Sequence, residues 1–143
     1  MEIEFFNVHN NEGKEKYYPI VSKWWEEWKW PSISPEFLST TGAIIKHEDE
    51  YICAAWLYQT DSLMCVVDFF ISVKKKFSGN LKKDSLKLLI NKLEELAQSN
   101  GFKAVYTSVK SQPLINLLLE LDYGKDSATE KGDINMTVFI KLI

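Results

Sequence analysis

The sequence contains no arginine, so all 17 of its strongly basic residues are lysines. Arginine forms paired hydrogen bonds to phosphate groups and base edges, and its absence removes the usual means of recognising nucleic acid. The formal net charge of -3 points the same way, because nucleic-acid-binding domains are generally basic. We therefore expect no nucleic-acid partner. An A/T-rich gene is a sufficient reason for the lysine-only usage.

Cysteine is also scarce. The only two, Cys53 and Cys65, both fall within expected strands. If those strands form a hairpin about Asp61, Cys53 lies opposite Phe69 rather than opposite Cys65, which predicts no disulfide. Buried, reduced thiols are typical of cytosolic proteins, and the acidic start at Met1 lacks the basic segment of a signal peptide. We expect a cytoplasmic protein.

Several other signals are missing. No apolar run approaches the ~20 residues of a membrane-spanning helix, which argues against a membrane partner. His9 and His47 are far apart and, apart from the acidic turn after His47, lack Cys, His or carboxylate neighbours at metal-binding spacing, so we predict no metal. No Walker motif, nucleophile elbow or Cys–His pair is present.

What is present indicates one globular domain spanning residues 1–143. Hydrophobic residues make up 45% of the chain and charged residues 26%, a balance typical of a folded core rather than of disorder. Aromatic residues reach 13%, with five tryptophans. This enrichment indicates either a large buried aromatic cluster or a ligand groove.

Hydrophobic periodicity gives the order of elements. It predicts strands at residues 3–8, 42–46, 51–59, 63–73, 104–109 and 134–142. Helices are predicted at 19–29, 81–100 and 112–121, with one helical turn at 35–38. The segments 10–13, 47–50 and 60–62 are expected loops or turns, and 127–133 a polar loop or weak strand edge.

This order predicts an α/β fold with a mixed sheet. The strands at 51–59 and 63–73 are apolar at nearly every position, so helices must cover both faces of the sheet. The helix at 81–100 joins two strands and therefore predicts a parallel crossover. The expected sheet has an antiparallel N-terminal half and a parallel step between the central strand, 63–73, and the next strand, 104–109.

A lysine-rich turn at residues 74–83 is the first candidate site. It lies before the N-terminus of the helix at 81–100, where backbone amides and the helix dipole attract anions. Lys82 and Lys83 are unfavourably placed there unless an anion is present. The alternative is that these lysines simply keep the surface soluble.

Asp68 is the second candidate, because it is an isolated carboxylate in an apolar strand. Trp56, Val66 and Phe70 are expected on its face. Burial raises the pKa of a carboxyl group toward the range of a general base. The alternative is a buried aspartate hydrogen-bonded to the backbone or to a Tyr or Trp donor.

Three segments carry a resemblance to a known family. They are Trp24-Trp25-Glu-Glu-Trp28-Lys-Trp30-Pro31, Thr41-Gly42-Ala-Ile-Ile45 and Asn100-Gly101-Phe102-Lys-Ala-Val-Tyr-Thr107-Ser108. Together with the order of elements, they make nearly the whole chain resemble the GNAT N-acetyltransferase superfamily. More narrowly, the chain looks like the short GNAT-like proteins that phages encode, which implies the host cytoplasm as its location.

The resemblance implies an acetyl-CoA-dependent N-acyltransferase whose acceptor is a small-molecule or peptide amine. The cofactor arm would enter where the strands at 68–73 and 104–109 separate, and Asp68 or a water molecule would act as the base. The implied cofactor-binding residues are Ile71, Ser72, Val73, Lys75, Lys76, Ser78, Gly79, Asn80, Lys82 and Lys83. The implied acceptor contacts are Trp25, Trp30, Tyr106 and Ser108, with Trp24 and Trp28 assigned to the core.

The sequence also differs from the family pattern. The family turn reads [QR]-x-x-G-x-[GA], whereas the chain offers Lys76-x-x-Gly79-x-Leu81 or Asn80-x-x-Lys83-x-Ser85. Leu118 stands where the family often has a tyrosine general acid. These differences keep a second interpretation open: a catalytically inactive GNAT-fold module that binds a CoA-like ligand or a host protein. An apolar edge at 134–143 is a candidate homodimer contact.

Overall fold

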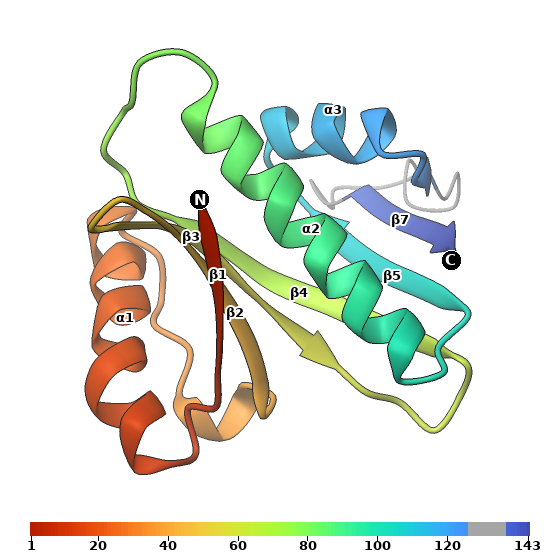
Figure 1. Ribbon diagram of the computed structural model, residues 1–143, viewed down its shortest axis with the longest axis horizontal. Coiled ribbons are helices and arrows are strands. Elements are labelled where there is room, and N and C mark those ends of the chain that lie inside the picture. The colour runs from red at the N-terminus through yellow and green to blue at the C-terminus, as the bar shows by residue number, and fades with distance from the viewer. Residues whose placement is uncertain (126–136) are drawn as a thin grey trace.

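The computed structural model describes residues 1–125 and 137–143, and its central feature is a seven-stranded sheet (Figure 1). The strands follow the order β1-β2-β3-β4-β5-β7-β6. Their bounds are β1 Glu2–Phe6, β2 Thr41–His47, β3 Glu50–Tyr58, β4 Met64–Ser72, β5 Ala104–Val109, β6 Gly124–Lys125 and β7 Thr137–Leu142. The helices are α1 Tyr18–Glu27, α2 Leu81–Ser99 and α3 Gln112–Glu120, with a short π-helix, η1 Gly13–Tyr17, and a short 3-10 helix, η2 Pro35–Phe37.

The strand directions confirm the mixed sheet. Strands β1 to β4 pair antiparallel, β4 pairs with β5 in parallel, and β7 pairs antiparallel with both β5 and β6. Helix α1 covers one face of the sheet, and α2 and α3 cover the other (Figure 1). The expectation of helices on both faces is therefore also confirmed. The segment expected at 127–133 and the start of the strand expected at 134–142 lie outside the described residues.

The two faces of the sheet have different cores. The face under α2 and α3 is largely aliphatic, and Leu89, Leu93 and Leu117 are buried there. The face under α1 is aromatic: Trp56 is fully buried and its ring stacks on that of Trp25 at 5.9 Å between centroids. The high tryptophan content therefore serves mainly as a core under α1.

Trp25 lies in the core rather than at a groove, and Trp28 packs against that core only partly buried. Trp25 is 3% exposed and belongs to the core, whereas Trp28, expected in the core, is half-buried at the end of α1. Trp24 is buried as expected, and Trp30 is 49% exposed. The reason is that Trp25 faces the ring of Trp56, a partner on β3 that helical spacing alone does not reveal.

Residues 10–13 do not form the expected loop, because the chain turns into η1 at Gly13. A Cβ atom at Gly13 would lie 1.8 Å from the backbone oxygen of Asn7, so only glycine allows this close approach. The π-helix η1 leads directly into α1, one residue before the Pro19 that the sequence suggested as the start.

The β3–β4 register also differs from the expected hairpin. Cys53 pairs with Ser72, not with Phe69. Two steps along β3, from Ala54 to Trp56, match three steps along β4, which places a bulge in β4. Both cysteines are free and buried, as predicted.

Strand β1 is tied to its neighbours through the carboxylate of Glu4. Its Oε1 accepts hydrogen bonds from the hydroxyls of Tyr17, at 2.7 Å, and Tyr51, at 2.8 Å. Burial opposes ionisation, but these hydrogen bonds and the charges of Lys16 and Lys46 outweigh it, so the pKa of Glu4 is lowered. Burial, together with the hydrogen bond to Glu4 and the charge of that carboxylate, raises the pKa of Tyr51 to about 12.

Replacing Glu4 by glutamine is expected to lower the free energy of unfolding at neutral pH by about 1 kcal/mol, since hydrogen bonds to a charged acceptor become neutral ones. Because the folded-state pKa is lowered, the carboxylate's contribution is present above the unfolded-state pKa of about 4.3 and is lost as the pH falls through the folded value. Urea titrations at neutral and acidic pH check this. An equal difference between the two proteins at both pH values would contradict it.

Candidate functional site

The parallel strands β4 and β5 separate soon after they begin to pair. Only three pairs join them, ending at Val66 and Tyr106. Beyond this point β4 continues beside β3 as far as Ser72, and β5 continues beside β7 as far as Val109. The facing edges of residues 67–72 and 107–109 are therefore not paired with each other. Unpaired main-chain groups at such an edge are available to a ligand with its own donors and acceptors. This is the separation that the resemblance implied.

The bulge of β4 lies within the separated segment. Phe69 has a φ of 57°, in the left-handed region, and its N–H donates to Oδ1 of Asp68 at 2.7 Å. Asp68 pairs with Trp56 on the face of α1, as predicted. Phe70 was also expected on this face, but it packs against the core on the opposite face. The bulge changes the alternation of side chains along β4, so Phe69 packs on the α1 face instead.

The pKa of the Asp68 carboxyl group is raised, which makes it a better proton acceptor than an exposed aspartate. Burial raises the pKa of its carboxyl group, and the N–H of Phe69 only partly opposes this. Burial also raises the pKa of Tyr58 to about 12, and the charge of Asp68 adds to that shift. The sequence left open that Asp68 is simply hydrogen-bonded to the backbone. That hydrogen bond is present, from the N–H of Phe69 to Oδ1 of Asp68, and the residue is half-buried.

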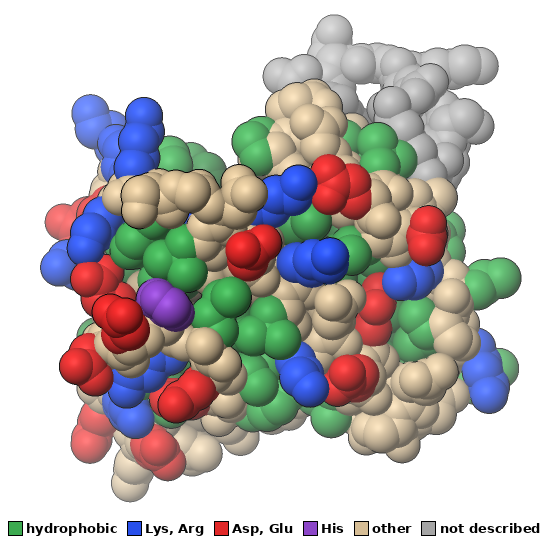
Figure 2. Space-filling model, turned by 45° about the horizontal axis from the view of Figure 1, so that its top comes forward, with side chains coloured by type: hydrophobic (Ala, Val, Ile, Leu, Met, Phe, Trp, Pro, Cys, Tyr) green, Lys and Arg blue, Asp and Glu red, His purple; other side chains and the backbone are tan. Residues whose placement is uncertain are grey.

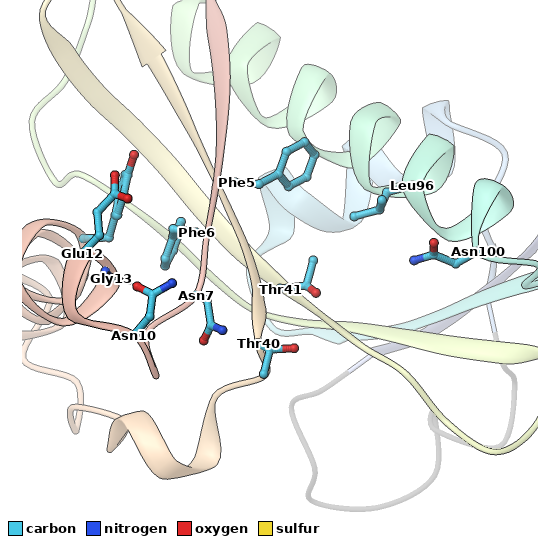
Figure 3. Close-up of a pocket in the computed structure, with 11 residues that line it drawn as sticks. Phe5, Phe6, Asn7, Asn10, Glu12, Gly13, Thr40, Thr41, Leu96 and Asn100 are labelled. Carbon is cyan, nitrogen blue, oxygen red and sulfur yellow. Dashed lines mark hydrogen bonds between the residues drawn. The ribbon is translucent and has the colours of Figure 1, made fainter.

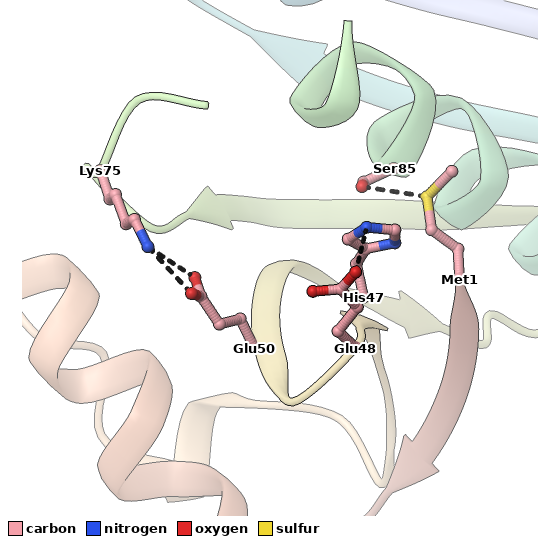
Figure 4. Close-up of polar contacts among 6 residues, drawn as sticks. All are labelled: Met1, His47, Glu48, Glu50, Lys75 and Ser85. Carbon is pink, nitrogen blue, oxygen red and sulfur yellow. Dashed lines mark hydrogen bonds and ion pairs between the residues drawn. The ribbon is translucent and has the colours of Figure 1, made fainter. Parts of the chain in front are cut away.

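Acidic residues already pair with two lysines of the turn at 74–83. Lys75 Nζ lies 2.9 and 3.0 Å from the carboxylate oxygens of Glu50, the first residue of β3 (Figure 4). Lys83 pairs with Glu120 at 3.1 Å. Figure 2 shows lysines interspersed with acidic residues rather than gathered in one basic patch.

The remaining lysines of the turn differ in accessibility. The ammonium of Lys82 donates to the carbonyl of Val73 at 2.7 Å, and burial lowers its pKa. Lys76 is exposed and, within residues 1–125 and 137–143, forms no ion pair. Lys74 is also exposed and without an ion pair in these residues, but its ammonium donates to the carbonyl of Glu27 at 3.5 Å and lies 5.6 Å from the ring centre of Trp28. Lys76 is therefore the most available lysine of the turn for an anionic ligand.

The N-terminus of α2 has no side-chain cap. Asn80 occupies the N-cap position without a capping hydrogen bond, so amides of the first helical turn remain available. Ser78, Gly79 and Asn80 are all exposed, and a Cβ at Gly79 would meet nothing within 4 Å. This end of α2 therefore has the room and the donors to accept a phosphate group.

The other candidates are distributed around the end of β4. Ile71 is buried under α1, so only its main chain faces the separated edge, whereas Ser72 and Val73 are half-buried. The indole N–H of Trp28 donates to the carbonyl of Ser72 at 2.7 Å, and Trp30 stacks on Trp28 at 5.7 Å. Trp30 thus lies near the end of β4, as a groove residue would.

The two candidates on β5 lie on the other side of the separation. Tyr106 and Ser108 are half-buried and alternate with Thr107, which is buried. They therefore share one face of β5, and Tyr106 belongs to the last pair before the strands part. Trp25 is not part of this arrangement, because it lies in the core under α1.

A pocket beside β1 was missed by the sequence reasoning. It has a volume of about 410 Å³ (Figure 3). Its lining comprises Phe5, Phe6, Asn7, Asn10, Glu12, Gly13, Tyr17, Thr40, Thr41, Leu96 and Asn100. None of the candidate residues lines it. It had no sequence signal, because its residues come from four separate segments.

The described residues contain neither a metal-binding cluster nor a membrane-spanning helix. Nowhere in residues 1–125 and 137–143 do three or more His, Cys, Asp or Glu side chains gather as they would around a metal ion. Of the helices in the same residues, none has the length and apolar character needed to cross a membrane.

No protein-family model matches the sequence, and no curated protein matches it in a sequence comparison. Solved structures do match. An aminoglycoside 6'-acetyltransferase type Ii matches with a TM-score of 0.71 and 17% identity, covering 99% of this chain and 97% of that one. The aminoglycoside 6'-N-acetyltransferase from Enterococcus faecium matches with a TM-score of 0.68 and 15% identity, with the same coverage.

The chain has the GNAT fold. A third similar structure is an aminoglycoside 6'-N-acetyltransferase complexed with coenzyme A, with a TM-score of 0.67, 13% identity, and coverage of 99% and 97%. In this GNAT fold, the separated edge, the bulge at Phe69 and the lysine turn follow one another along β4 and the turn after it.

Proposed function

We propose that the protein is an acyl-CoA-dependent N-acyltransferase that acetylates an amine. The observation that carries this proposal is the separation of β4 from β5, which leaves a free main-chain edge beside the half-buried carboxylate of Asp68. The fold is shared with acetyltransferases, one of them complexed with coenzyme A, which supports the same assignment.

The residues around the separation are suited to acetyl-CoA. The edge of β4 over residues 67–72, which does not pair with β5, would offer main-chain groups to the amides of the cofactor arm. The uncapped start of α2 would offer N–H groups to its pyrophosphate. Gly79 leaves the approach open, and Lys76 supplies an unpaired charge. When bound, acetyl-CoA supplies the acyl group as an activated thioester.

Asp68 would supply the proton chemistry. An amine attacks a thioester only in its neutral form, so the ammonium form must first lose a proton. The Asp68 carboxylate would accept that proton, directly or through a water molecule, before the neutral amine attacks. As the C–N bond forms and the C–S bond breaks, the nitrogen would lose a second proton, which neutralises the departing CoA thiolate. Its raised pKa brings its basicity closer to that of a useful general base.

The acceptor would contact the α1 face beside the end of β4. Trp30 offers an exposed aromatic ring, and Tyr106 and Ser108 offer hydroxyl groups across the separation. These contacts suit a small-molecule or peptide amine. The resemblance to short phage-encoded proteins would place that acceptor in the host cytoplasm.

The deciding experiment is calorimetric titration with acetyl-CoA and with dephospho-CoA, followed by detection of free CoA thiol in the presence of a panel of amines. We expect acetyl-CoA binding in the micromolar range and amine-dependent thiol release. Absence of detectable binding at millimolar acetyl-CoA would rule out the proposal.

Replacing Lys76 by alanine is expected to weaken acetyl-CoA binding about threefold to fivefold, the range for one exposed charge contact. Lys83→Ala is the matched control, because Lys83 is already paired with Glu120 and should contribute less. Glu50→Gln should have the opposite effect, since it releases Lys75 toward the ligand. Titration calorimetry at low salt measures all three. Equal losses for Lys76 and Lys83 would argue against this site.

A second function has its own support. Partners already hold Lys75, Lys82 and Lys83, and Leu118, at the position where the family often has a tyrosine acid, is 1% exposed. These features favour a GNAT-fold module that binds a CoA-like ligand or a host protein without catalysis. Acetyl-CoA binding without thiol release across the amine panel would favour this alternative.

A further inference from the structure

The outer edge of β1 is a surface that the proposed transfer reaction does not use. Strand β1 is the first strand of the sheet and pairs with β2 alone among the described strands. Its outward main-chain groups therefore lack a neighbouring strand, which makes this edge a template for strand addition. Phe5, next to the end of β1, is 49% exposed.

The pocket of about 410 Å³ beside this edge extends over both faces of β1. Leu96 and Asn100 line it from α2, whereas Gly13 and Tyr17 line it from η1, and Figure 3 shows β1 between these two groups. A ligand that fills the pocket must therefore cross or follow the main chain of β1. Such a position suits an extended polypeptide, whose own main chain can pair with the edge.

The side-chain amides in the pocket have fixed orientations. Asn7 Oδ1 accepts a hydrogen bond from the N–H of His9, and Asn10 Oδ1 accepts one from the N–H of Gly13, each at 2.8 Å. Because these oxygens are occupied, the amide nitrogens of both residues remain as donors. Asn100 adds a third amide on the α2 side. Donors of this kind match the carbonyl groups of a peptide.

The charges around the edge indicate what kind of peptide fits. Glu12 lines the pocket, and no lysine does. Glu12 forms no ion pair within the described part of the chain. Glu2 and Glu4 lie on β1 itself; Glu2 is paired with Lys46 across the β1–β2 ladder, and Glu4 lies 3.9 Å from Lys16. A second copy of β1 would bring like charges together, so a basic partner is favoured.

We propose that the edge of β1 and its pocket bind an extended, basic segment of another polypeptide by strand addition. The segment pairs its main chain with β1, directs carbonyl groups to the amides of Asn7 and Asn10, and places a lysine or arginine near Glu12. The apolar lining from Phe5 and Leu96 receives an uncharged side chain from the alternate position of the same segment.

The test uses an N-acetylated octapeptide of alternating lysine and valine, labelled for fluorescence anisotropy. The control peptide alternates glutamate and valine. We expect the basic peptide to bind the wild-type protein and the acidic peptide not to bind. Amide hydrogen exchange should slow in β1 when the basic peptide is added. Failure of the basic peptide to bind at millimolar concentration, or equal binding of both peptides, overturns the proposal.

A charge reversal locates the peptide. Glu12→Lys is expected to weaken binding of the basic peptide about threefold to tenfold, since it replaces attraction by repulsion. Glu36→Lys is the matched control, because Glu36 is an exposed glutamate on η2 outside the pocket. Both are surface positions, and far-UV circular dichroism confirms folding. Equal effects of the two reversals, or protection of another strand edge, would place the peptide elsewhere and overturn the proposal.

Discussion

Replacing Asp68 by asparagine is expected to lower kcat about a hundredfold or more, the usual loss when a general base is removed. Binding of acetyl-CoA should stay close to that of the wild type. Asparagine keeps an oxygen that accepts the N–H of Phe69, so the bulge of β4 is retained. The variant therefore removes the proton acceptor while leaving the separated edge in place. Thiol release and calorimetry on the same preparation measure the two quantities.

The pH dependence gives a second readout of Asp68. Burial raises the pKa of this carboxyl above its ordinary value of about 3.9, and only its ionised form accepts a proton. We expect kcat/KM of the wild type to fall on the acid side through this raised pKa, and the limb to be absent in Asp68→Asn. Unchanged kcat in the variant would assign proton removal to water alone.

The direction of the change in stability that Asp68→Asn causes can also be predicted. A carboxyl with a raised folded-state pKa ionises more readily in the unfolded chain, so ionisation at neutral pH favours unfolding. Wild-type stability gains from this group as the pH falls through the folded pKa. Asp68→Asn should therefore unfold at a urea midpoint no lower than that of the wild type at neutral pH. A clear drop would show that Asp68 is needed for the fold and would weaken any kinetic interpretation.

Replacing Trp25 by alanine is expected to lower the free energy of unfolding by about 3–5 kcal/mol, the range for removing a large buried aromatic side chain. Trp25 is 3% exposed, stacks on Trp56 and meets the ring of Tyr18 edge-on. The cavity left behind lies between α1 and the sheet, where the surrounding rings cannot collapse into it. Urea or thermal unfolding measures the loss.

Trp30→Ala provides the matched control for Trp25→Ala. Both tryptophans lie within six positions of one another in the chain, but Trp30 is 49% exposed and contacts Trp28 on one face only. Its removal should cost about 1 kcal/mol or less in stability. Under the proposed function it should instead raise KM for the acceptor. Similar stability losses for the two variants would contradict the burial described for Trp25.

The arrangement of strands and helices was predictable because their patterns are long and unambiguous. The helix over 81–99 has regular apolar spacing, and its position between two apolar strands required a parallel crossover. The register within β4 was not predictable. Phe69 and Phe70 are both apolar, so the strand has no alternation that would reveal a bulge or show which ring faces α1.

The sequence predicted where the candidate site lies in the fold, but it did not predict which residues contact one another there. The position of the lysine turn follows from its neighbours in the chain. Its partners do not, because Glu50 and Glu120 are distant in sequence and meet Lys75 and Lys83 only in the folded protein. The burial of Trp25 depends in the same way on Trp56. The pocket beside β1 is lined in part by Gly13, which allows the close approach of the Asn7 backbone. That approach is not apparent from the sequence, because it depends on how the chain folds back on β1.

The short pairing of β4 with β5 divides the sheet into two leaves. One leaf comprises β1 to β4 and the other comprises β5, β7 and β6, and the three pairs ending at Val66 and Tyr106 form the hinge between them. Helix α2 lies across the aliphatic face, and its apolar side chains pack in one core with residues from both leaves (Figure 1). A molecule seated between the leaves would act as a wedge on one side of the hinge. Such a molecule would contact both halves of the protein at once, so its binding would add contacts between β4 and β5 where the strands themselves make none.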